Sequence, residues 1–289
     1  MPSVTVVGVI LGSMAAATLS AGAQTATPAH RLARTVAGAP VAKALVITVT
    51  GKDFKFDAPD EIPAGLTEFR FLNKGPSIHH MQILKITNGK TFAQLRTALD
   101  KGGRPPRWMH EAGGPNAAAP GTESNATLML EPGNYAIICF VDIGGAPHFT
   151  KGMIRPLRVT AATGAVAPDP KPDVTATLFD YNFKLSSPIL AGARTIRVQN
   201  IAKQPHEVQL VQLAPGKTAH DFLAWAGGGM KGPPPAKPIG GIAGIEPGMS
   251  ESFTANFTPG NYAFICFISD AKDGKPHFMH GMTKDFSVK

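Results

Sequence analysis

A nine-residue stretch occurs twice in this chain of 289 residues, at positions 132–140 and 259–267, with one substitution between the copies. Each copy contains a cysteine and is followed by Pro-His-Phe and then Gly-Met. The match extends upstream at a constant offset of 127, so that Asp53 matches Asp180, and nothing is inserted between that aspartate and the cysteine. A gap-free repeat of this length indicates duplication of one domain. The chain is therefore expected to fold as two copies of the same unit.

The residue pattern within each copy favours short strands. Only 17% of residues are charged, and the chain holds 31 Gly and 26 Pro, which is typical of a loop-rich β protein. Residues 45–50, 67–73, 79–86, 126–130 and 154–160 have the apolar alternation of strands. The intervening residues 103–121 are rich in Gly, Pro and Ala and are expected to form a loop.

One helix is expected in each copy. Thr91 followed by Gln94 is a capping-box signal, and Phe92, Leu95 and Leu99 follow at helical spacing. The second copy repeats the signal from Thr218. The predicted fold class is all-β: two tandem Greek-key β-sandwiches, each with a short crossover helix.

The N-terminal residues and a Pro-rich stretch in the middle of the chain predict how it is divided into segments. Residues 4–19 are apolar and precede an A-x-A-like cleavage site, which indicates an export signal and a periplasmic or secreted protein. An uncleaved membrane anchor, or peripheral association, is the alternative. The predicted segments are a signal peptide at 1–23, a flexible leader at 24–43, domain 1 at 44–160, a Pro-rich linker at 161–172 and domain 2 at 173–289.

The two cysteines, Cys139 and Cys266, occupy equivalent positions in the two copies. A disulfide would have to join two separate domain cores, so each is expected to be an unpaired, buried thiol. His148 and Met153 follow Cys139, and a matching histidine and methionine follow Cys266. Cysteine, histidine and methionine are the soft ligands that copper prefers.

A fourth ligand should come from a strand far upstream of each cysteine. The second copy offers His206, and the first offers His79 or His80. The repeat register selects His79, which stands 60 residues before Cys139, as His206 stands 60 residues before its own cysteine. His80 then falls opposite Glu207 and is expected to be exposed.

These motifs together resemble the cupredoxins, the family of plastocyanin and azurin: Gly-x-Tyr-x-x-x-Cys, then His and Met, with a lone upstream His. The resemblance covers nearly the whole chain after the leader, twice. It implies a type 1 copper centre in each domain, with these ligands: His79, Cys139, His148, Met153; and His206, Cys266, His277, Met282.

The loops after the cysteines depart from the smallest family members. Eight residues separate Cys139 from His148, and ten separate Cys266 from His277. The first spacing is similar to that of copper-containing nitrite reductases. The second is longer, which makes copper binding less certain at the second site. His80 and Glu207 also stand where family members often carry Asn, which bears on the hydrogen bonding of the cysteine sulfur.

The resemblance implies an electron-transfer protein. It places His148 and His277 at an exposed edge, with Phe149 and Phe278 in an apolar docking patch. The net charge of +8 favours an acidic redox partner. No Lys/Arg block is interleaved with aromatic residues, which argues against a nucleic-acid partner.

Enzymatic activity is not expected from the sequence. Copper oxidases and nitrite reductases need a second copper site made of histidines, and no His-x-His occurs in the chain. The histidines outside the two predicted sites form no symmetric or clustered set: His30, His80, His110, His220 and His280. The acids Glu246 and Glu251 are interpreted as solvated turn charges.

Two other functions stay open. One is a copper-free β-sandwich that serves in binding, adhesion or complex assembly. The other is copper handling, as a buffer or chaperone, for which the ten methionines and nine histidines would supply ligands without redox turnover.

Overall fold

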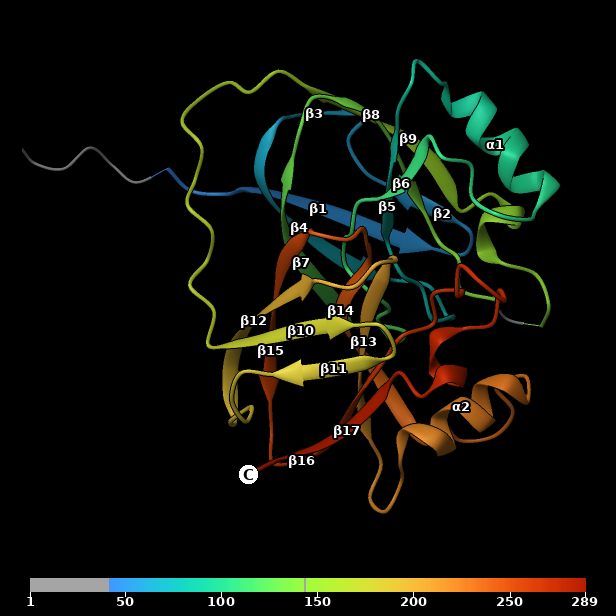
Figure 1. The fold of residues 1–289 in the computed structure, drawn as a ribbon, viewed down its shortest axis with the longest axis vertical. Coiled ribbons are helices and arrows are strands. Elements are labelled where there is room, and N and C mark those ends of the chain that lie inside the picture. Colours follow the sequence, from blue (N-terminus) through green and yellow to red (C-terminus); the bar gives the residue numbers. More distant parts are fainter. Residues whose placement is uncertain (1–41, 143) are drawn as a thin grey trace, which may run out of the picture. The chain divides into compact units, whose positions relative to one another are not determined.

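The computed structural model describes residues 42–142 and 144–289 (Figure 1). The predicted signal peptide, and the predicted leader up to residue 41, lie outside these residues. The described residues belong to one compact unit, Pro40–Lys289. The domain boundaries at 160 and 173 stay a prediction, since the two copies share one sheet.

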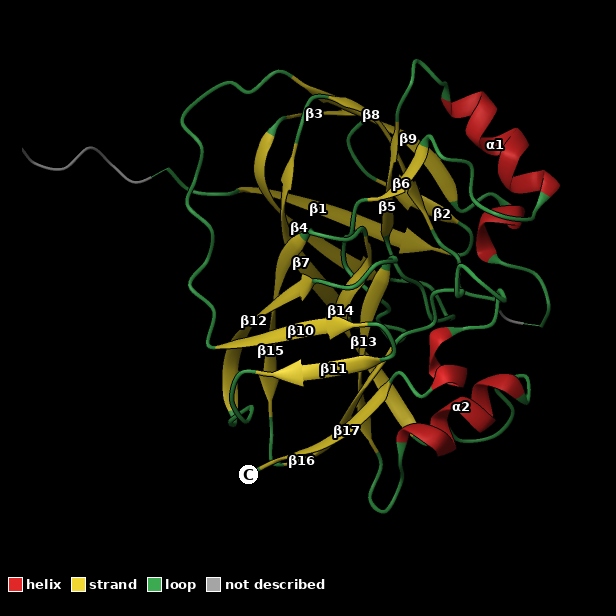
Figure 2. Ribbon diagram, in the orientation of Figure 1, coloured by secondary structure: helices red, strands yellow, loops and turns green. Residues whose placement is uncertain are grey.

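Strands dominate both copies, and each copy carries a short helix (Figure 2). The elements of the first copy are β1 Leu45–Lys52, β2 Lys55–Asp57, β3 Glu61–Pro63, β4 Gly65–Asn73, β5 Gln82–Ile86, α1 Phe92–Lys101, β6 Met109–Glu111, β7 Glu123–Leu130, β8 Gly133–Ile138, the 3-10 turn η1 His148–Lys151 and β9 Ile154–Thr160. Those of the second are β10 Val174–Phe179, β11 Asn182–Leu185, β12 Gly192–Asn200, β13 His206–Leu213, α2 Ala219–Gly227, β14 Ala236–Ile245, β15 Ser250–Phe257, β16 Gly260–Ile265, the 3-10 turn η2 His277–His280 and β17 Thr283–Val288.

Three sheets make two sandwiches. An eight-stranded sheet runs β11-β10-β12-β15-β7-β4-β1-β2, so each copy contributes four neighbouring strands to it. The first copy adds the sheet β3-β9-β8-β5-β6, and the second adds β14-β13-β16-β17. In both copies the first strand pairs parallel with a later one, β1 with β4 and β10 with β12. The predicted all-β fold of two sandwiches is confirmed.

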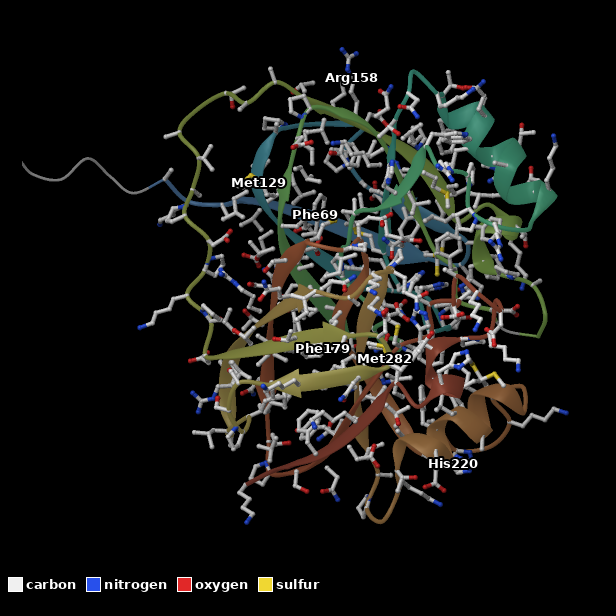
Figure 3. All side chains as sticks on the ribbon, viewed as in Figure 1. Phe69, Met129, Arg158, Phe179, His220 and Met282 are labelled. Carbon is white, nitrogen blue, oxygen red and sulfur yellow. The ribbon has the colours of Figure 1, made fainter. Side chains whose placement is uncertain are left out.

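Apolar side chains fill the space between the sheets. Phe69 and Phe71 point inward from alternate positions of β4 and are fully buried, and Figure 3 shows Phe69 among the interior side chains. Burying such a side chain contributes about 1.5–3 kcal/mol. The cysteines and the methionines after them are fully buried members of this core.

The two helices begin where the capping boxes predict. The Thr91 hydroxyl accepts from the Gln94 backbone N–H at 3.2 Å, and the Gln94 side chain accepts from the Thr91 N–H at 3.0 Å. Thr218 and Asp221 form the same pair of bonds at the start of α2. Both helices are thus fixed locally by their first turn.

The two copies meet through an internal pseudo-two-fold arrangement. Isolated bridges pair Ala112 with Ile245 and Ala118 with Ile239, and Pro115 pairs with Ile242. The offset of 127 converts the first pair into the second and the third into itself. A contact of i with j that is mirrored by j with i is the mark of a two-fold interface.

Two glutamines hold this interface together. The Gln82 carboxamide donates to the Gly244 carbonyl at 3.0 Å and accepts from the Gly244 N–H at 2.6 Å. Its repeat counterpart Gln209 makes the same two bonds to Ala117, at 3.2 and 3.0 Å. Both side chains are buried, so removing either would leave buried backbone groups without partners.

The structure differs from the sequence-based expectation at two places. Residues 103–121 were expected to be a loop, but they contain β6, and residues 112–118 bridge the second copy. The predicted strand 79–86 begins only at Gln82, because His79 forms an isolated bridge to Ala118 instead. No helix of the described residues is long and apolar enough to cross a membrane.

Candidate metal centres

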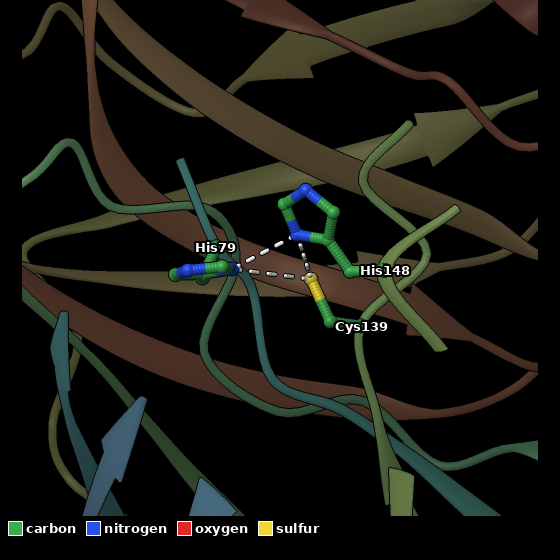
Figure 4. A group of neighbouring side chains, drawn as sticks. All are labelled: His79, Cys139 and His148. Carbon is green, nitrogen blue, oxygen red and sulfur yellow. Dashed lines mark hydrogen bonds between the residues drawn. The ribbon is translucent and has the colours of Figure 1, made fainter. Parts of the chain in front are cut away.

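The first candidate centre lies at one end of the first sandwich (Figure 4). His79 precedes β5, Cys139 follows β8, and His148 opens η1. The Nδ1 atoms of His79 and His148 are 2.9 Å apart, and the Cys139 Sγ lies 4.0 Å from the first and 3.6 Å from the second. All three side chains are buried.

The second candidate centre repeats this geometry. His206 opens β13, Cys266 follows β16, and His277 opens η2. The Cys266 Sγ lies 3.8 Å from His206 Nδ1 and 3.4 Å from His277 Nδ1. The ring centroids of the two histidines are 4.4 Å apart, against 4.7 Å in the first centre.

Backbone hydrogen bonds hold each methionine turn against its cysteine. The Cys139 N–H donates to the Met153 carbonyl at 3.0 Å, and the Cys266 N–H donates to the Met282 carbonyl at 3.2 Å. Both methionines are fully buried, and Figure 3 labels Met282. The chain fold therefore brings cysteine, second histidine and methionine to the same place in both copies.

An aspartate fixes the orientation of each upstream histidine. Asp53 Oδ1 lies 2.5 Å from His79 Nε2, and Asp180 Oδ1 lies 3.0 Å from His206 Nε2. A carboxylate on Nε2 holds the proton there and leaves Nδ1 free as a metal ligand. The repeat offset of 127 matches these aspartates across the copies, but the residue pattern gives them no role. Only the fold shows that each reaches its histidine.

Burial favours the neutral forms of the cysteine and histidine side chains in both centres. It raises the pKa of the Cys139 thiol to about 12, and raises that of the Cys266 thiol well above its ordinary range. It lowers the pKa of His148 and of His277 to about 4. The imidazoles are therefore neutral, as metal ligands must be, and a bound cation is needed to hold the cysteines as thiolates.

Main-chain N–H groups already point at the sulfur atoms. The backbone groups of His80 and Val141 lower the pKa of the Cys139 thiol against the effect of burial. Cys266 receives the equivalent bonds from Glu207 and Ile268, with the Glu207 N–H at 3.5 Å from Sγ. Such donors stabilise a thiolate and tune the metal bound to it.

The dimensions of both groups suit a metal ion. A trigonal ion about 2.0 Å from two imidazole nitrogens and about 2.3 Å from a sulfur separates these atoms by about 3.5–3.7 Å. The Cys–His separations given above, 3.4–4.0 Å, bracket that range, whereas the Nδ1 atoms of His79 and His148, at 2.9 Å, are closer together than such an ion would hold them. Two neutral imidazoles and one thiolate are the soft donor set of copper rather than of a hard cation. Both groups are thus compatible with copper.

A different aromatic ring covers each centre. Phe54 lies edge-on against His148, with ring centroids 4.9 Å apart, and the Lys151 Nζ sits 4.7 Å from the Phe54 ring centroid. Tyr181, its repeat counterpart, lies 5.6 Å from the His277 ring. The Tyr181 hydroxyl donates to Asp270 at 2.6 Å, so the second cover is polar.

A third group of potential ligands lies in the longer loop: Asp270, Asp273 and His280. The Asp270 carboxylate already accepts from Tyr181, from Gln204 and from the N–H groups of Lys272 and Asp273. These bonds shape the loop, and they account for the group without a metal.

Six of the eight predicted ligands converge on two points, which are the two His/Cys/His groups. Their assignment as copper ligands stays a prediction, as does that of the two methionines. Both cysteines are free, as expected.

Several predicted surroundings of the centres are wrong. His148 is 1% exposed and His277 is 0% exposed, so neither forms an exposed edge. Phe149 is 8% exposed and packs against Phe140 at 5.6 Å instead of forming a docking patch with Phe278. The Phe278 ring is likewise occupied, stacking edge-on against Phe267 at 5.4 Å.

Two further residues that were expected to meet solvent are buried. His80 is 8% exposed and Glu251 is 2% exposed. Glu251 accepts from the Gly114 N–H at 3.2 Å across the interface, so it is no solvated turn charge. Sequence patterns within one copy carry no information about a surface that the other copy covers.

No protein-family model matches this chain, and neither does any curated protein sequence. Among solved structures it is similar to auracyanin from Roseiflexus castenholzii, with 19% identity, 41% of this chain and 99% of that chain covered, and a TM-score of 0.28. It is also similar to a blue copper oxidase from Nitrosomonas europaea, with 15% identity, 86% of each chain covered and a TM-score of 0.28. A third is the copper-containing nitrite reductase from Thermus scotoductus, with 11% identity, 85% of this chain and 61% of that chain covered, and a TM-score of 0.23.

The two-sandwich architecture and the paired His/Cys/His groups bear out the predicted resemblance to cupredoxins. The prediction that the chain is not an enzyme is contradicted, because an oxidase and a nitrite reductase stand among the similar structures. The sequence-based prediction rested on the histidines outside the two predicted sites, which form no symmetric or clustered set that could hold a second copper.

Proposed function

We propose that this chain of two cupredoxin-like domains is a copper-dependent redox protein with a type 1 centre in each domain, and that each centre passes single electrons. The observation that carries the proposal is the pair of buried His/Cys/His groups with matching geometry. A bound copper would supply a one-electron Cu(II)/Cu(I) couple. His79, Cys139, His148 and Met153 would hold it in the first domain, and His206, Cys266, His277 and Met282 in the second.

The protein's own residues would keep the centre rigid during turnover. Asp53 and Asp180 orient the upstream histidines, and the N–H groups beside the cysteines face the sulfur atoms. The strands on which the ligands lie are hydrogen-bonded on both sides, β8 between β5 and β9, and β16 between β13 and β17. Little movement is then needed between the two oxidation states.

Electrons would enter and leave through the aromatic covers. Phe54 and Tyr181 are half-buried, and each lies between solvent and a buried second histidine. Lys151 stands over Phe54 at the first centre, and the chain as a whole carries a net charge of +8. These features favour a docking partner with an acidic surface and fast, salt-sensitive association.

The proposed location is the periplasm or the cell exterior. The support is the apolar N-terminal segment with its A-x-A-like site. An unpaired buried thiol is compatible with an oxidising compartment when a metal occupies it.

Copper loading tests the proposal directly. The purified protein given Cu(II) is expected to develop intense blue or green thiolate-to-copper absorption and to bind two equivalents by metal analysis. The Cys139→Ser/Cys266→Ser double variant is the matched control and should stay colourless. A colourless unmodified protein would leave the copper-free binding module as the better function.

The same preparation separates the remaining functions. A reversible one-electron couple by voltammetry supports electron transfer, and colour without such a couple would indicate copper handling. Oxygen uptake with phenolic donors, and nitrite consumption with a reductant, measure whether the electrons pass to a small substrate.

A further inference from the structure

A groove lies between the edge strands β11 and β17 of the second copy. β11 ends the eight-stranded sheet and β17 ends the four-stranded sheet that packs on it, and the two strands lie beside one another (Figure 1). The groove has a volume of about 690 Å³. Its walls combine apolar side chains with two lysines, and they include Phe179, Phe183, Lys184, Leu185, Ser187 and Lys284. None of these residues belongs to the candidate metal centres.

The first copy closes the corresponding place with one side chain. Arg155 on β9 reaches across to β2, where its guanidinium donates to the Ala58 carbonyl at 2.6 Å and to the Phe56 carbonyl at 3.5 Å. The same guanidinium is paired with the Asp60 carboxylate. The seam between the two sheets is thus filled by an arginine and sealed by an ion pair.

The second copy lacks both parts of this closure. Lys284 takes the place of Arg155, because each stands opposite the same repeat position of the preceding strand. Ser187 takes the place of Asp60 at the offset of 127. A lysine has no planar fork of N–H groups, and the serine removes the carboxylate that holds the fork in the first copy. Residues 188–190, at the positions of β3, also form no strand. These differences account for the open groove.

The edge strand β11 turns backbone groups toward the groove. In an antiparallel pair, alternate residues direct their N–H and C=O groups away from the partner strand. The Ser186 N–H donates to the Thr175 carbonyl of β10 at 2.9 Å. Phe183 and Leu185 stand three residues and one residue before Ser186, so their backbone groups point outward. Their repeat counterparts in the first copy are the two residues whose carbonyls bond to Arg155.

We propose that this groove binds an acidic segment of a partner protein in an extended conformation. The segment adds to β11 as a further strand, and its N–H groups bond to the carbonyls that the arginine occupies in the first copy. An acidic side chain of the segment pairs with Lys284, as Asp60 pairs with Arg155. Lys184 adds a second positive charge to the wall. The proposal does not depend on copper.

The groove suits a peptide better than a small anion. An exposed edge strand is a template for pairing with another chain. Phe179 is 37% exposed in the wall and offers an apolar surface to the uncharged side chains of such a segment. A free carboxylate would satisfy the lysines alone and would leave the outward carbonyls of β11 to water.

Peptide binding to the full chain tests the proposal. The probe is a fluorescent peptide of alternating valine and glutamate, and its control is a peptide of alternating valine and lysine. We expect the acidic peptide to bind by fluorescence anisotropy and to shift the amide resonances of Phe183 and Leu185, and the basic peptide to do neither. The measurement needs no copper, so its failure is distinct from a failure of the copper-loading experiment.

Two groove variants and one control sharpen the test. Lys284→Glu reverses the charge that receives the acidic side chain and is expected to weaken binding about tenfold or more. Ser187→Asp/Lys284→Arg restores the residues of the first copy and should close the groove with a similar loss. Lys237→Ala is the matched control, because Lys237 is exposed on β14, at the opposite edge of the same sheet. It should leave the affinity unchanged.

Three outcomes would overturn the proposal. One is equal binding of the acidic and the basic peptide. Another is binding of free glutamate as tight as that of the acidic peptide, since no added strand would then be involved. The third is an affinity that neither groove variant changes.

Discussion

The two candidate centres share their ligands but differ in what covers them. The loop from Cys139 to His148 has eight residues, and that from Cys266 to His277 has ten. Yet the Cys–His distances agree within 0.2 Å, at 3.6 and 4.0 Å against 3.4 and 3.8 Å. Ligand geometry is therefore set by the strands and not by loop length.

The extra residues are accommodated away from the ligands. Each loop closes through the same bond, from the His148 N–H to the Val141 carbonyl at 2.9 Å and from the His277 N–H to the Ile268 carbonyl at 2.8 Å. Beyond that bond the longer loop folds into a turn, in which the Asp270 N–H donates to the Lys275 carbonyl at 2.8 Å. The longer loop therefore does not change the distances between the ligand atoms of the second centre. The two centres differ instead in the charge of the residues that cover them. Lys151 stands at the first cover and Asp270 at the second.

Single cysteine variants should produce the largest difference between the two centres. Cys139→Ser is expected to abolish thiolate-to-copper absorption at the first centre and leave the second intact, and Cys266→Ser should do the reverse. Absorption and copper content of the loaded proteins measure this. Loss of both centres in either variant would show that they do not fill independently.

The aspartates behind the upstream histidines should have the next largest effect. Asp53→Ala and Asp180→Ala each remove the partner of a ligand Nε2, and such losses lower metal affinity by about 10–100-fold. Asp53 is the less exposed of the two carboxylates, 25% against 36%, so solvent screens its contact less and the first centre should lose more. Competition with a chromophoric chelator measures both affinities. Equal losses would contradict the ranking.

At the interface, one copy carries an ionisable side chain where the other copy carries none. The titration of this side chain should appear in the pH dependence of stability. Burial raises the pKa of Glu251 to about 8, while its repeat counterpart is Ser124. Because the unfolded chain releases this proton near the ordinary glutamate pKa of 4.5 and the folded chain holds it, stability should fall as pH rises from about 4.5 to 8. Glu251→Gln should flatten that slope and raise stability at pH 8 by about 1–3 kcal/mol.

Thermal unfolding across this pH range checks the effect. The exposed Glu123→Gln variant is the control, and it should change stability by less than about 0.5 kcal/mol. A slope that is the same with and without Glu251 would assign the pH dependence to other groups.

The charge difference between the covers should appear in the reduction potentials. Hydrogen bonds from Tyr181 and Gln204 hold the pKa of Asp270 well below its usual range, so the carboxylate is ionised, and it lies 3.8 Å from His277 Nε2. A negative charge there favours Cu(II). Asp270→Asn should raise the potential of the second centre by about 60 mV, which is a tenfold change in the one-electron equilibrium. Voltammetry of both centres should show no shift at the first.

The smallest predicted effect comes from Gly75. A Cβ at this position would lie 2.7 Å from both Asp53 Oδ1 and His79 Nε2, whereas the second copy carries Ala202 at the equivalent position. Gly75→Ala should therefore loosen the Asp53–His79 contact and bring the metal affinity of the first centre closer to that of the second. An unchanged affinity would mean that the glycine has no part in the difference.

The sequence predicted the fold and the grouping of the His/Cys/His side chains because both depend on contacts within one copy. The gap-free offset located His79 rather than His80, and the capping boxes located both helices. The sequence carried no sign of the burial of Glu251 and of residues 112–118, whose surroundings are supplied by the other copy, or of His80, which packs against Phe140 of its own copy. It also missed the role of Asp53, because strand periodicity does not show which loop side chain reaches which histidine.

The unequal covers of the two centres have a consequence for their symmetry. In a homodimer of identical domains every residue occurs twice, and two equivalent metal centres must have equal potentials. Fusion into one chain removes this constraint, because it permits Lys151 at one cover and Asp270 at the other. The two proposed copper centres can therefore differ in potential, and the lower potential is expected beside Asp270.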